Sequence, residues 1–284
     1  MKYKLREEIK TTLLIGLTLL VWIPLWMILS GSLMGESEIV QNVGPVFNQS
    51  KGMADWTLFP QYLTMRPFVK LLFDSPNFFI MFWNSCIQVI PILIGQLLIA
   101  TPAAWGFARY EFRGKNILFF LYIILMVLPF QVTMVSSYLV LYRFKLIDTH
   151  LSIILPNIFS AFPVFIMTKF FKTIPKSLIE AAKLDGANEG YLFLKVGIPL
   201  GKSGIFSALV LGFIEYWNAI EQPITFLVRK KNLWPLSLYI SSITTEKIGV
   251  AFSASVIILI PTLLIFLYGQ KYLEQGIAAS GLKE

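Results

Sequence analysis

Residues 180–187 read EAAKLDGA, and residues 196–199 read VGIP. Both belong to a polar, lysine-rich insert, residues 171–203, that stands between two strongly apolar segments. An insert of this length and polarity is more than a connector. Two roles are open from composition alone: a docking surface for a soluble protein, or a basic loop held at the lipid headgroups.

The composition of the chain indicates a membrane protein. It has 284 residues, of which 56% are hydrophobic and only 14% charged, with a mean hydropathy of +0.70. Soluble domains carry about 25% charged residues. The net charge of +8 is typical of basic cytoplasmic loops, so we expect a lipid bilayer as the surroundings and no nucleic acid as a partner.

Six segments have about the 20 apolar residues that cross a bilayer as a helix. We predict an all-α polytopic protein, a single membrane domain over residues 1–284 with six transmembrane helices and a polar insert. All six segments contain proline, which indicates bent helices around a pathway. The predicted spans are 11–30, 79–107, 116–139, 151–170, 204–227 and 249–270.

The distribution of basic residues predicts the orientation. With the N-terminus inside, the inner segments hold 15 Lys and Arg residues and the outer segments hold 9. The positive-inside rule therefore places both termini, and the insert, in the cytoplasm. A single cysteine, Cys86, and a single histidine, His150, make a metal site improbable.

Within the insert, Lys176–Ala187 is rich in helix formers and predicts a short helix. Gly186 permits the backbone angle that ends or bends such a helix, and Pro199 is expected to stop the next helical piece. The residues expected to form an apolar strip are Ile179, Ala182 and Leu184. A weak pair between Glu180 and Lys183 is also expected.

One pattern in the insert imitates a phosphate-binding loop. Gly197–Ser203 reads GIPLGKS, but the loop requires four residues between its first glycine and the Gly-Lys-Ser run, and here there are three. Pro199 also interrupts it. Nucleotide binding by this chain is therefore not expected.

The insert resembles the EAA motif of the membrane-spanning subunits of bacterial ABC importers. Glu180–Ala182, Gly186 and Val196–Pro199 carry the motif, and Asp185–Ala187 has the form found in carbohydrate permeases. The other matching stretches are Asn84-Ser85, Ala103–Arg109, Phe112–Lys115, Trp217-Asn218 and Gln270–Lys283. The chain departs from the pattern at Ile198, where leucine is usual, and near Ser203, where a proline is common.

The resemblance covers residues 11–283 and is greatest to the second, six-span permease of maltose-type sugar importers. It implies a non-catalytic permease in a bacterial cytoplasmic membrane, moving its cargo by alternating access. The implied partners are a homologous second permease, an ABC ATPase dimer and an extracytoplasmic solute-binding protein. ATP and Mg²⁺ would bind the ATPase, and this chain would bind no cofactor.

By the same resemblance, the residues from about Lys176 to Ala187 form a coupling helix that sits in a cleft of the ATPase. Glu180 would be a polar anchor, Gly186 the bend and Pro199 the stop. The full set of expected ATPase-coupling residues is Glu180, Ala181, Ala182, Asp185, Gly186, Ala187 and Pro199.

Polar residues within the apolar spans are candidates for the translocation path. The polar candidates are Gln88, Gln96, Gln131, Asn157, Glu215, Asn218 and Glu221. We select Gln131, Glu215 and Asn218, with Trp217 beside Asn218, since sugars favour amide hydrogen bonds and stacking on aromatic faces. Hydrogen bonding between helices and an interfacial aromatic belt are alternative explanations. Alternative cargoes are glycerol phosphate or another polyol, and the alternative class is a non-ABC transporter or channel.

Overall fold

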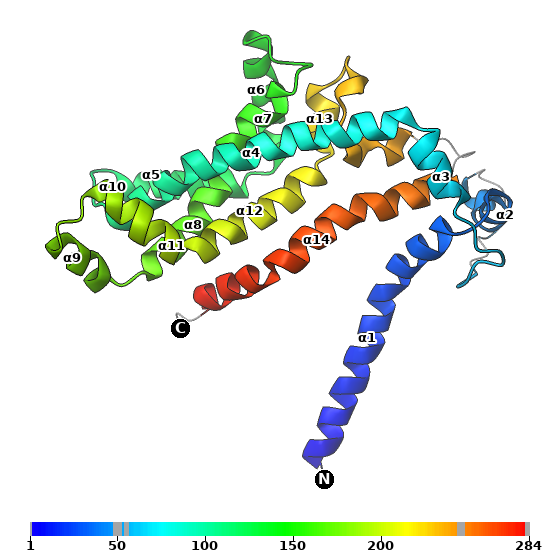
Figure 1. The fold of residues 1–284 in the computed structure, drawn as a ribbon, viewed down its shortest axis with the longest axis horizontal. Helices are drawn as coiled ribbons and strands as arrows, with labels where there is room; N and C mark the ends of the chain where they lie inside the picture. The colour runs from blue at the N-terminus through cyan, green and yellow to red at the C-terminus, as the bar shows by residue number, and fades with distance from the viewer. Residues whose placement is uncertain (1, 48–52, 54–56, 243–247, 282–284) are drawn as a thin grey trace. The chain divides into compact units, whose positions relative to one another are not determined.

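A computed structural model describes residues 2–47, 53, 57–242 and 248–281 of the chain (Figure 1). Every regular element in these residues is helical. The chain divides into two compact units, Met1–Phe79 with Tyr239–Ile260, and Ile80–Leu238 with Pro261–Glu284, called unit 1 and unit 2 below. The long helices α4 (Pro76–Arg109) and α14 (Ile248–Gly281) contribute to both.

The apolar helices make this a multi-pass membrane protein. Four helical segments are long and apolar enough to span a bilayer: Glu7–Ser32, Pro76–Arg109, Leu151–Thr173 and Ile248–Glu274. Two further candidates are pairs of helices, Lys115–Val127 with Phe130–Arg143 and Glu189–Leu200 with Lys202–Trp217, bent by 103° and 68°. By length and composition, the described residues thus contain four candidate spans, or up to six if each bent pair is one span.

The third predicted span, 116–139, is not one straight helix. α5 (Lys115–Val127) ends where Leu128 adopts an extended backbone with ψ 121°, and α6 (Phe130–Arg143) starts after Pro129. A residue that precedes proline is pushed away from the helical region, because the proline ring collides with its backbone. Pro129 therefore accompanies a sharp turn of 103° between two helices, where the sequence predicted one bent helix.

The fifth predicted span, 204–227, also ends early. α12 (Lys202–Trp217) stops ten residues before the predicted end, and a short α13 (Glu221–Phe226) follows after a break at Asn218. The remaining helical elements are α7 (Leu151–Ile158), α8 (Ala161–Thr173), α9 (Lys176–Leu184), α10 (Glu189–Tyr191), the π-helix η1 (Leu192–Gly197), α11 (Ile198–Leu200), and the 3₁₀ turns Lys231–Leu233, Leu236–Leu238 and Ile240–Ser242.

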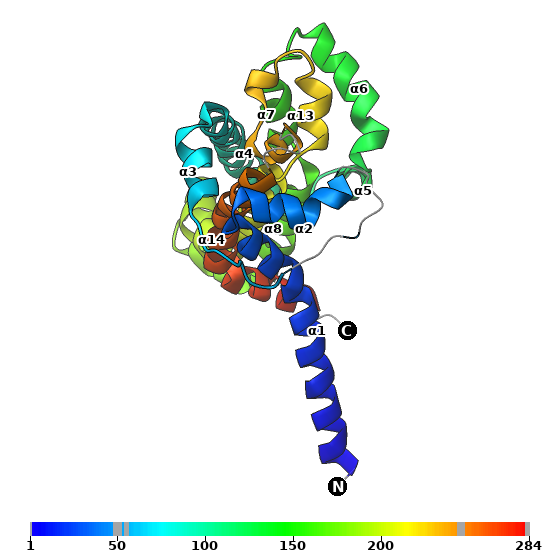
Figure 2. The same cartoon turned by 90° about the vertical axis from the view of Figure 1, so that its right-hand side faces the viewer.

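In unit 1, α1 (Lys2–Ser32) is a long helix (Figure 2). Its apolar side chains from Ile9 to Leu25 are exposed. Its C-terminal end leads to α2 (Glu36–Phe47) and α3 (Arg66–Phe73). Met34, Ile39 and Ile248 form a small buried cluster there. Trp26 of α1 donates its indole N–H to the carbonyl of Leu58 at 2.7 Å, which links α1 to the segment that precedes α3.

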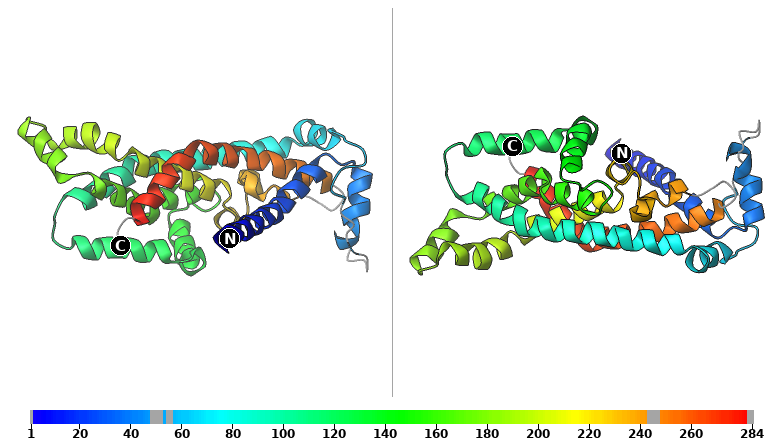
Figure 3. Two further views of the ribbon diagram at one scale, coloured as in Figure 1. Left: turned by 90° about the horizontal axis from the view of Figure 1, so that it is seen from below. Right: turned by 90° about the horizontal axis from the view of Figure 1, so that it is seen from above.

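Unit 2 is held together by α8, which packs against both α5 and α12. Its core at the end that bears the insert contains Trp105, Met167 and Phe171, all almost fully buried. Glycines let the helices approach closely: a Cβ on Gly201 would lie 2.2 Å from the Phe171 ring, and one on Gly204 would lie 2.5 Å from Phe170. Helices α9, α10 and α11 lie together at one end of this unit (Figure 3).

Candidate functional site

The polar insert forms a short helix with two different faces. Ile179 and Ala182 of α9 pack on the core cluster of unit 2. Leu178, Ala181 and Leu184 point away from it, and Leu184 is 89% exposed. The predicted strip of Ile179, Ala182 and Leu184 is therefore wrong in one member, because a spacing of five residues carries Leu184 round to the outer face.

Gly186 ends α9 as the sequence predicts. Its φ is +86°, a left-handed backbone that side chains with a Cβ adopt only with strain. The Gly186 N–H donates to the carbonyl of Lys183 at 3.0 Å, and the Ala187 N–H donates to the carbonyl of Ala182 at 3.0 Å. These two bonds form a Schellman cap, and Ala182 and Ala187 both rest on the core.

The cap reverses the chain and brings Glu189 back to α9. Lys183 Nζ donates to Glu189 Oε1 at 2.7 Å, so its ionic partner is Glu189 and not the expected Glu180. Tyr110 Oη donates to the other oxygen of the same carboxylate at 2.7 Å. The Lys183 bond and then the Tyr110 bond lower the pKa of Glu189, and the Glu189 bond raises the pKa of Lys183.

The expected coupling residues of α9 lie on or next to its exposed side. Glu180, Ala181 and Asp185 are exposed, whereas Ala182 and Ala187 are partly covered by the core. The backbone N–H of Asp185 donates to the carbonyl of Ala181 as the helix ends. The insert thus presents an outer surface formed by Leu178, Glu180, Ala181, Leu184 and Asp185, called the α9 outer face below.

Pro199 does not stop the helix, contrary to the prediction. It lies inside α11, and the chain turns at Gly201 before α12 begins. Since proline has no N–H for the carbonyl four residues earlier, the preceding turn widens: Ile198 N–H donates to the carbonyl of Phe193, five residues back, within a π-helical segment. Gly197–Ser203, the imitation of a phosphate loop, is this helical stretch.

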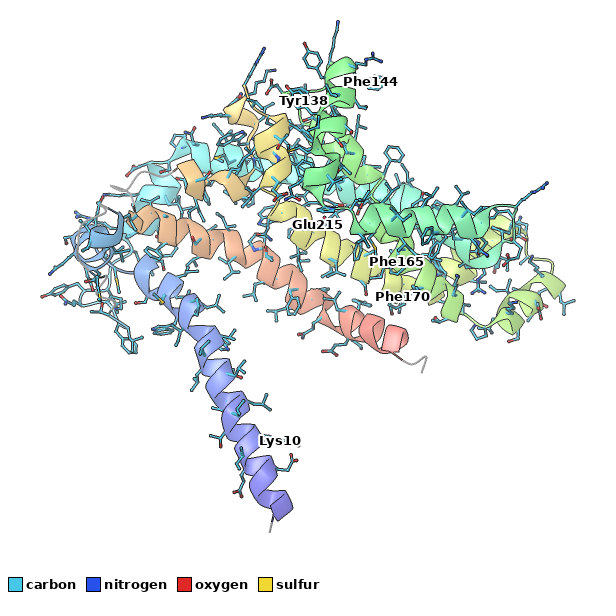
Figure 4. All side chains as sticks on the ribbon, turned by 180° about the vertical axis from the view of Figure 1, so that it is seen from behind. Lys10, Tyr138, Phe144, Phe165, Phe170 and Glu215 are labelled. Carbon is cyan, nitrogen blue, oxygen red and sulfur yellow. The ribbon has the colours of Figure 1, made fainter. Side chains whose placement is uncertain are left out.

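The translocation-path candidates Glu215, Trp217 and Asn218 lie at the C-terminal end of α12, whereas the insert precedes the start of this helix. Glu215 is labelled in Figure 4. Gln131 donates its amide to Glu221 Oε1 at 2.7 Å, joining α6 to α13. Glu215 and Asn218 are exposed, and Asn218 donates back to the carbonyl of Ile214 at 2.8 Å.

Trp217 is placed differently from the other candidates. It is only 3% exposed, stacks on Phe213 at 5.3 Å between ring centroids, and meets Phe82 edge to face at 5.8 Å. A sugar stacks on an open ring face. In the structure the indole packs between helices, and its place on the path stays a prediction.

A buried amide network lies beside these residues and contains Gln96 and Asn157, two of the polar candidates that were not selected. Gln96 Nε2 donates to Tyr216 Oη and to the carbonyl of Asn157, each at 2.8 Å. Asn157 in turn donates to Gln222 Oε1 at 2.6 Å. Gln96 and Asn157 were visible as polar residues in apolar spans, but their partners lie 61 to 120 residues away and no local spacing indicates them.

The pair Arg109 and Tyr110 at the end of α4 was not among the predicted site residues, yet it contacts the insert. Arg109 Nη2 donates to the carbonyls of Phe171 at 2.6 Å and Ile174 at 2.9 Å. Its guanidinium also lies over the Trp105 ring at 5.2 Å. Both residues belong to or follow the Ala103–Arg109 stretch, which was noted only for its resemblance.

Comparison with known proteins agrees with this architecture. The family described as "Binding-protein-dependent transport system inner membrane component" matches residues 96–279. A solved bacterial ABC transporter involved in the import of the acidic polysaccharide alginate contains a chain that superimposes with a TM-score of 0.80, covering 95% of this chain and 96% of that one at 22% identity. That likeness concerns the fold.

Curated relatives align over most of the chain. The arabinooligosaccharides transport system permease protein AraQ of Bacillus subtilis (strain 168) is 28% identical, over 94% of this chain and 92% of its own. The probable ABC transporter permease protein PH1036 of Pyrococcus horikoshii is 30% identical, over 78% and 82%. The sn-glycerol-3-phosphate transport system permease protein UgpE of Pectobacterium atrosepticum is 27% identical, over 73% and 75%. The chain therefore belongs to the family of binding-protein-dependent transport system inner membrane components, the non-catalytic permease subunits of ABC transporters.

Proposed function

We propose that the chain is a permease subunit of a bacterial importer for a neutral sugar or oligosaccharide, with partner ATPases driving alternating access. In this proposal both termini lie in the cytoplasm, α9 is the coupling helix, and a homologous second permease completes the pathway. An extracytoplasmic solute-binding protein delivers the cargo. ATP and Mg²⁺ bind the ATPase dimer, and no cofactor binds this chain.

The observation that carries the proposal is the α9 outer face. Leu184 is 89% exposed on a short polar helix whose opposite side is fixed to the core of unit 2. Burial of this exposed apolar side chain by a partner would remove it from water and favour binding. Because the Schellman cap and the core fix α9, a force applied to this face acts on the packed helices behind it.

A pull-down tests the ATPase assignment. Leu184→Glu puts a charge into the proposed contact, and burial of one leucine is worth about 1.5–3 kcal/mol, so we expect the ATPase to bind at least roughly tenfold more weakly. Leu58→Glu is the matched control, since Leu58 is also exposed, at 59%, but belongs to unit 1 on the predicted outer side. Equal ATPase recovery with both variants would refute the assignment.

The polar groups near the end of α12 favour a neutral cargo. They are amides and carboxylates: Gln131, Glu215, Asn218, Glu221 and Gln222. A phosphate ester is usually held by Arg or Lys, and this described set contains neither. We therefore favour a sugar, in line with the name of the AraQ relative, over the glycerol 3-phosphate named for the UgpE relative.

Transport assays separate these cargoes. Proteoliposomes that hold the complete transporter and its solute-binding protein are offered labelled neutral oligosaccharides or labelled sn-glycerol 3-phosphate. Uptake of an oligosaccharide that requires ATP inside the vesicles supports the proposal. Uptake of the phosphate ester alone would reject the sugar, and uptake without ATP would reject the ABC mechanism in favour of a different transporter class.

A further inference from the structure

The end of α4 contacts the insert on both sides of α9. On the side where the insert begins, Arg109 Nη2 donates to the carbonyls of Phe171 and Ile174, the last turn of α8 and the residue just before Pro175. On the side where it returns, Tyr110 Oη donates to Glu189 Oε2 at 2.7 Å. Two adjacent residues of one helix end thus hold the two ends of a segment of about fifteen residues.

Arg109 donates to carbonyl groups at the end of α8, where the helical hydrogen-bond pattern runs out. The Phe171 carbonyl otherwise accepts a long bond of 3.4 Å from the Ile174 N–H, and Pro175, which follows Ile174, has no N–H to offer. A guanidinium at a helix C-terminus provides donors and a favourable charge. Stacking of Arg109 over Trp105 at 5.2 Å fixes the direction from which it donates.

The Glu189 contact joins three pieces of chain through one carboxylate. Oε1 accepts from Lys183 on α9, and Oε2 accepts from Tyr110 after α4. Asn188 closes the same turn by accepting the Tyr191 N–H at 2.8 Å. The carboxylate therefore fixes the distance between α9 and the end of α4 as well as the fold of the turn itself.

Apolar contacts lie between the two polar ones. Trp105 of α4 lies against Gly197, where a Cβ would come within 2.6 Å of its ring. Ile179 and Ala182 of α9 pack on the same core cluster as Trp105. Hydrogen bonds from Arg109 and Tyr110 add directional contacts to this non-directional packing.

We propose that Arg109, Tyr110 and Glu189 are positioning residues that make α9 and the end of α4 move as one body when the ATPases close. The proposal rests on the proposed function, and it adds a second route from the coupling helix into the membrane helices, besides the direct chain connections to α8 and α12. Loss of the Tyr110–Glu189 bond leaves α9 bound to its ATPase but loosens its hold on α4.

The charges in this group contribute little to folding, which makes the test informative. Lys183 and Glu189 are about half exposed, and exposed ion pairs gain little because solvent screens them and side-chain entropy opposes them. Tyr110→Phe removes one hydroxyl and leaves the ring. We therefore expect normal expression and assembly, with the defect confined to coupling.

The experiment uses the complete transporter in proteoliposomes and measures ATP hydrolysed per substrate imported. Tyr110→Phe and Glu189→Gln are expected to raise this ratio by roughly 2- to 30-fold, the range of coupling changes along a contact network. The double variant is expected to show less than the sum of the two single effects, since both changes act on the Tyr110–Glu189 contact. Tyr191→Phe, an exposed tyrosine of the same insert, is the matched control and keeps the wild-type ratio.

Two results would overturn the inference. One is an unchanged ratio in Tyr110→Phe and Glu189→Gln while the wild-type protein imports in an ATP-dependent way. The other is an equal rise in Tyr191→Phe. If the wild-type transporter shows no ATP-dependent import at all, the proposed function itself fails, and that outcome is distinct from both.

Discussion

Gly186 shows how one residue determines the shape of the insert. With φ at +86° and no atom within 4 Å of the place a Cβ would take, the constraint is the backbone angle and not the space. Gly186→Ala is expected to cost about 1–2 kcal/mol and to reduce transport, because the turn that returns Glu189 to Lys183 is strained. Uptake and thermal unfolding of the purified transporter measure the two effects.

Gly114 offers the matched control for that prediction. It has the same φ of +86° and equally open space, but it lies between α4 and α5. Gly114→Ala is expected to lose similar stability and to keep more of its transport at a temperature where both variants stay folded. Equal loss of transport in the two variants would show that Gly186 has no special role.

The lowered pKa of Glu189 predicts that the contacts within the insert depend on pH. The hydrogen bond from Lys183 is the first cause of this lowered pKa. The ionised carboxylate therefore stabilises the insert fully above the ordinary carboxyl pKa, and this stabilisation is lost as the pH falls through the lowered pKa. The pKa values of Lys183 and Tyr110 are raised, chiefly by the same carboxylate, so their contributions persist at neutral pH and fade only in alkali. The contact is therefore complete near pH 7.

A spin label measures this directly. Placed at Lys176→Cys in a Cys86→Ser background, it is expected to gain mobility as the pH is lowered from 7 into the acidic range. In Glu189→Gln the label should already be mobile at pH 7 and should lack the acid step. A step that persists in Glu189→Gln would assign it to another group.

Single residues also show where local sequence reasoning succeeds. Gly186 was predictable because a glycine that follows a run of helix formers indicates a cap. The partner of Lys183 was not, since Glu189 becomes its neighbour only after the cap reverses the chain. Arg109 and Tyr110 meet groups 62 to 79 residues away, and such contacts leave no periodic signal.

At the scale of helices, the interface between α8 and α12 depends on glycine. Gly201→Ala would place a Cβ 2.2 Å from the Phe171 ring, and Phe171 is fully buried. Overpacking of this kind costs about 1–3 kcal/mol, so we expect a lower melting temperature in detergent. Gly106→Ala, with nothing within 4 Å of the added Cβ, is the control and should keep the wild-type value; a normal melting temperature for Gly201→Ala would contradict the packing.

The sequence predicts well where the helices lie, and less well where a helix is interrupted. Apolar length alone located the spans at Glu7–Ser32, Pro76–Arg109 and Ile248–Glu274. Prolines had uneven consequences: Pro91 and Pro102 lie within one continuous helix, whereas Pro129 accompanies a bend of 103°. Tertiary contacts decide whether a chain continues through a proline, and hydropathy does not report them.

For the whole molecule, the family assignment limits what this chain does alone. As a permease subunit it hydrolyses no ATP, so force must enter through a surface, and the α9 outer face has the exposure and the rigid support that such a surface needs. The insert and the polar groups at the end of α12 both belong to unit 2. The same compact unit thus carries the proposed coupling surface and the proposed path.

The most direct measurement uses a single cysteine at Leu184→Cys in a Cys86→Ser background. A membrane-impermeant maleimide is expected to leave it unlabelled in intact cells and to label it in inside-out vesicles stripped of the ATPase. Adding the ATPase back should protect the cysteine, and a short cross-linker should join the two proteins. Labelling in intact cells, or full labelling in the presence of saturating ATPase, would contradict the account.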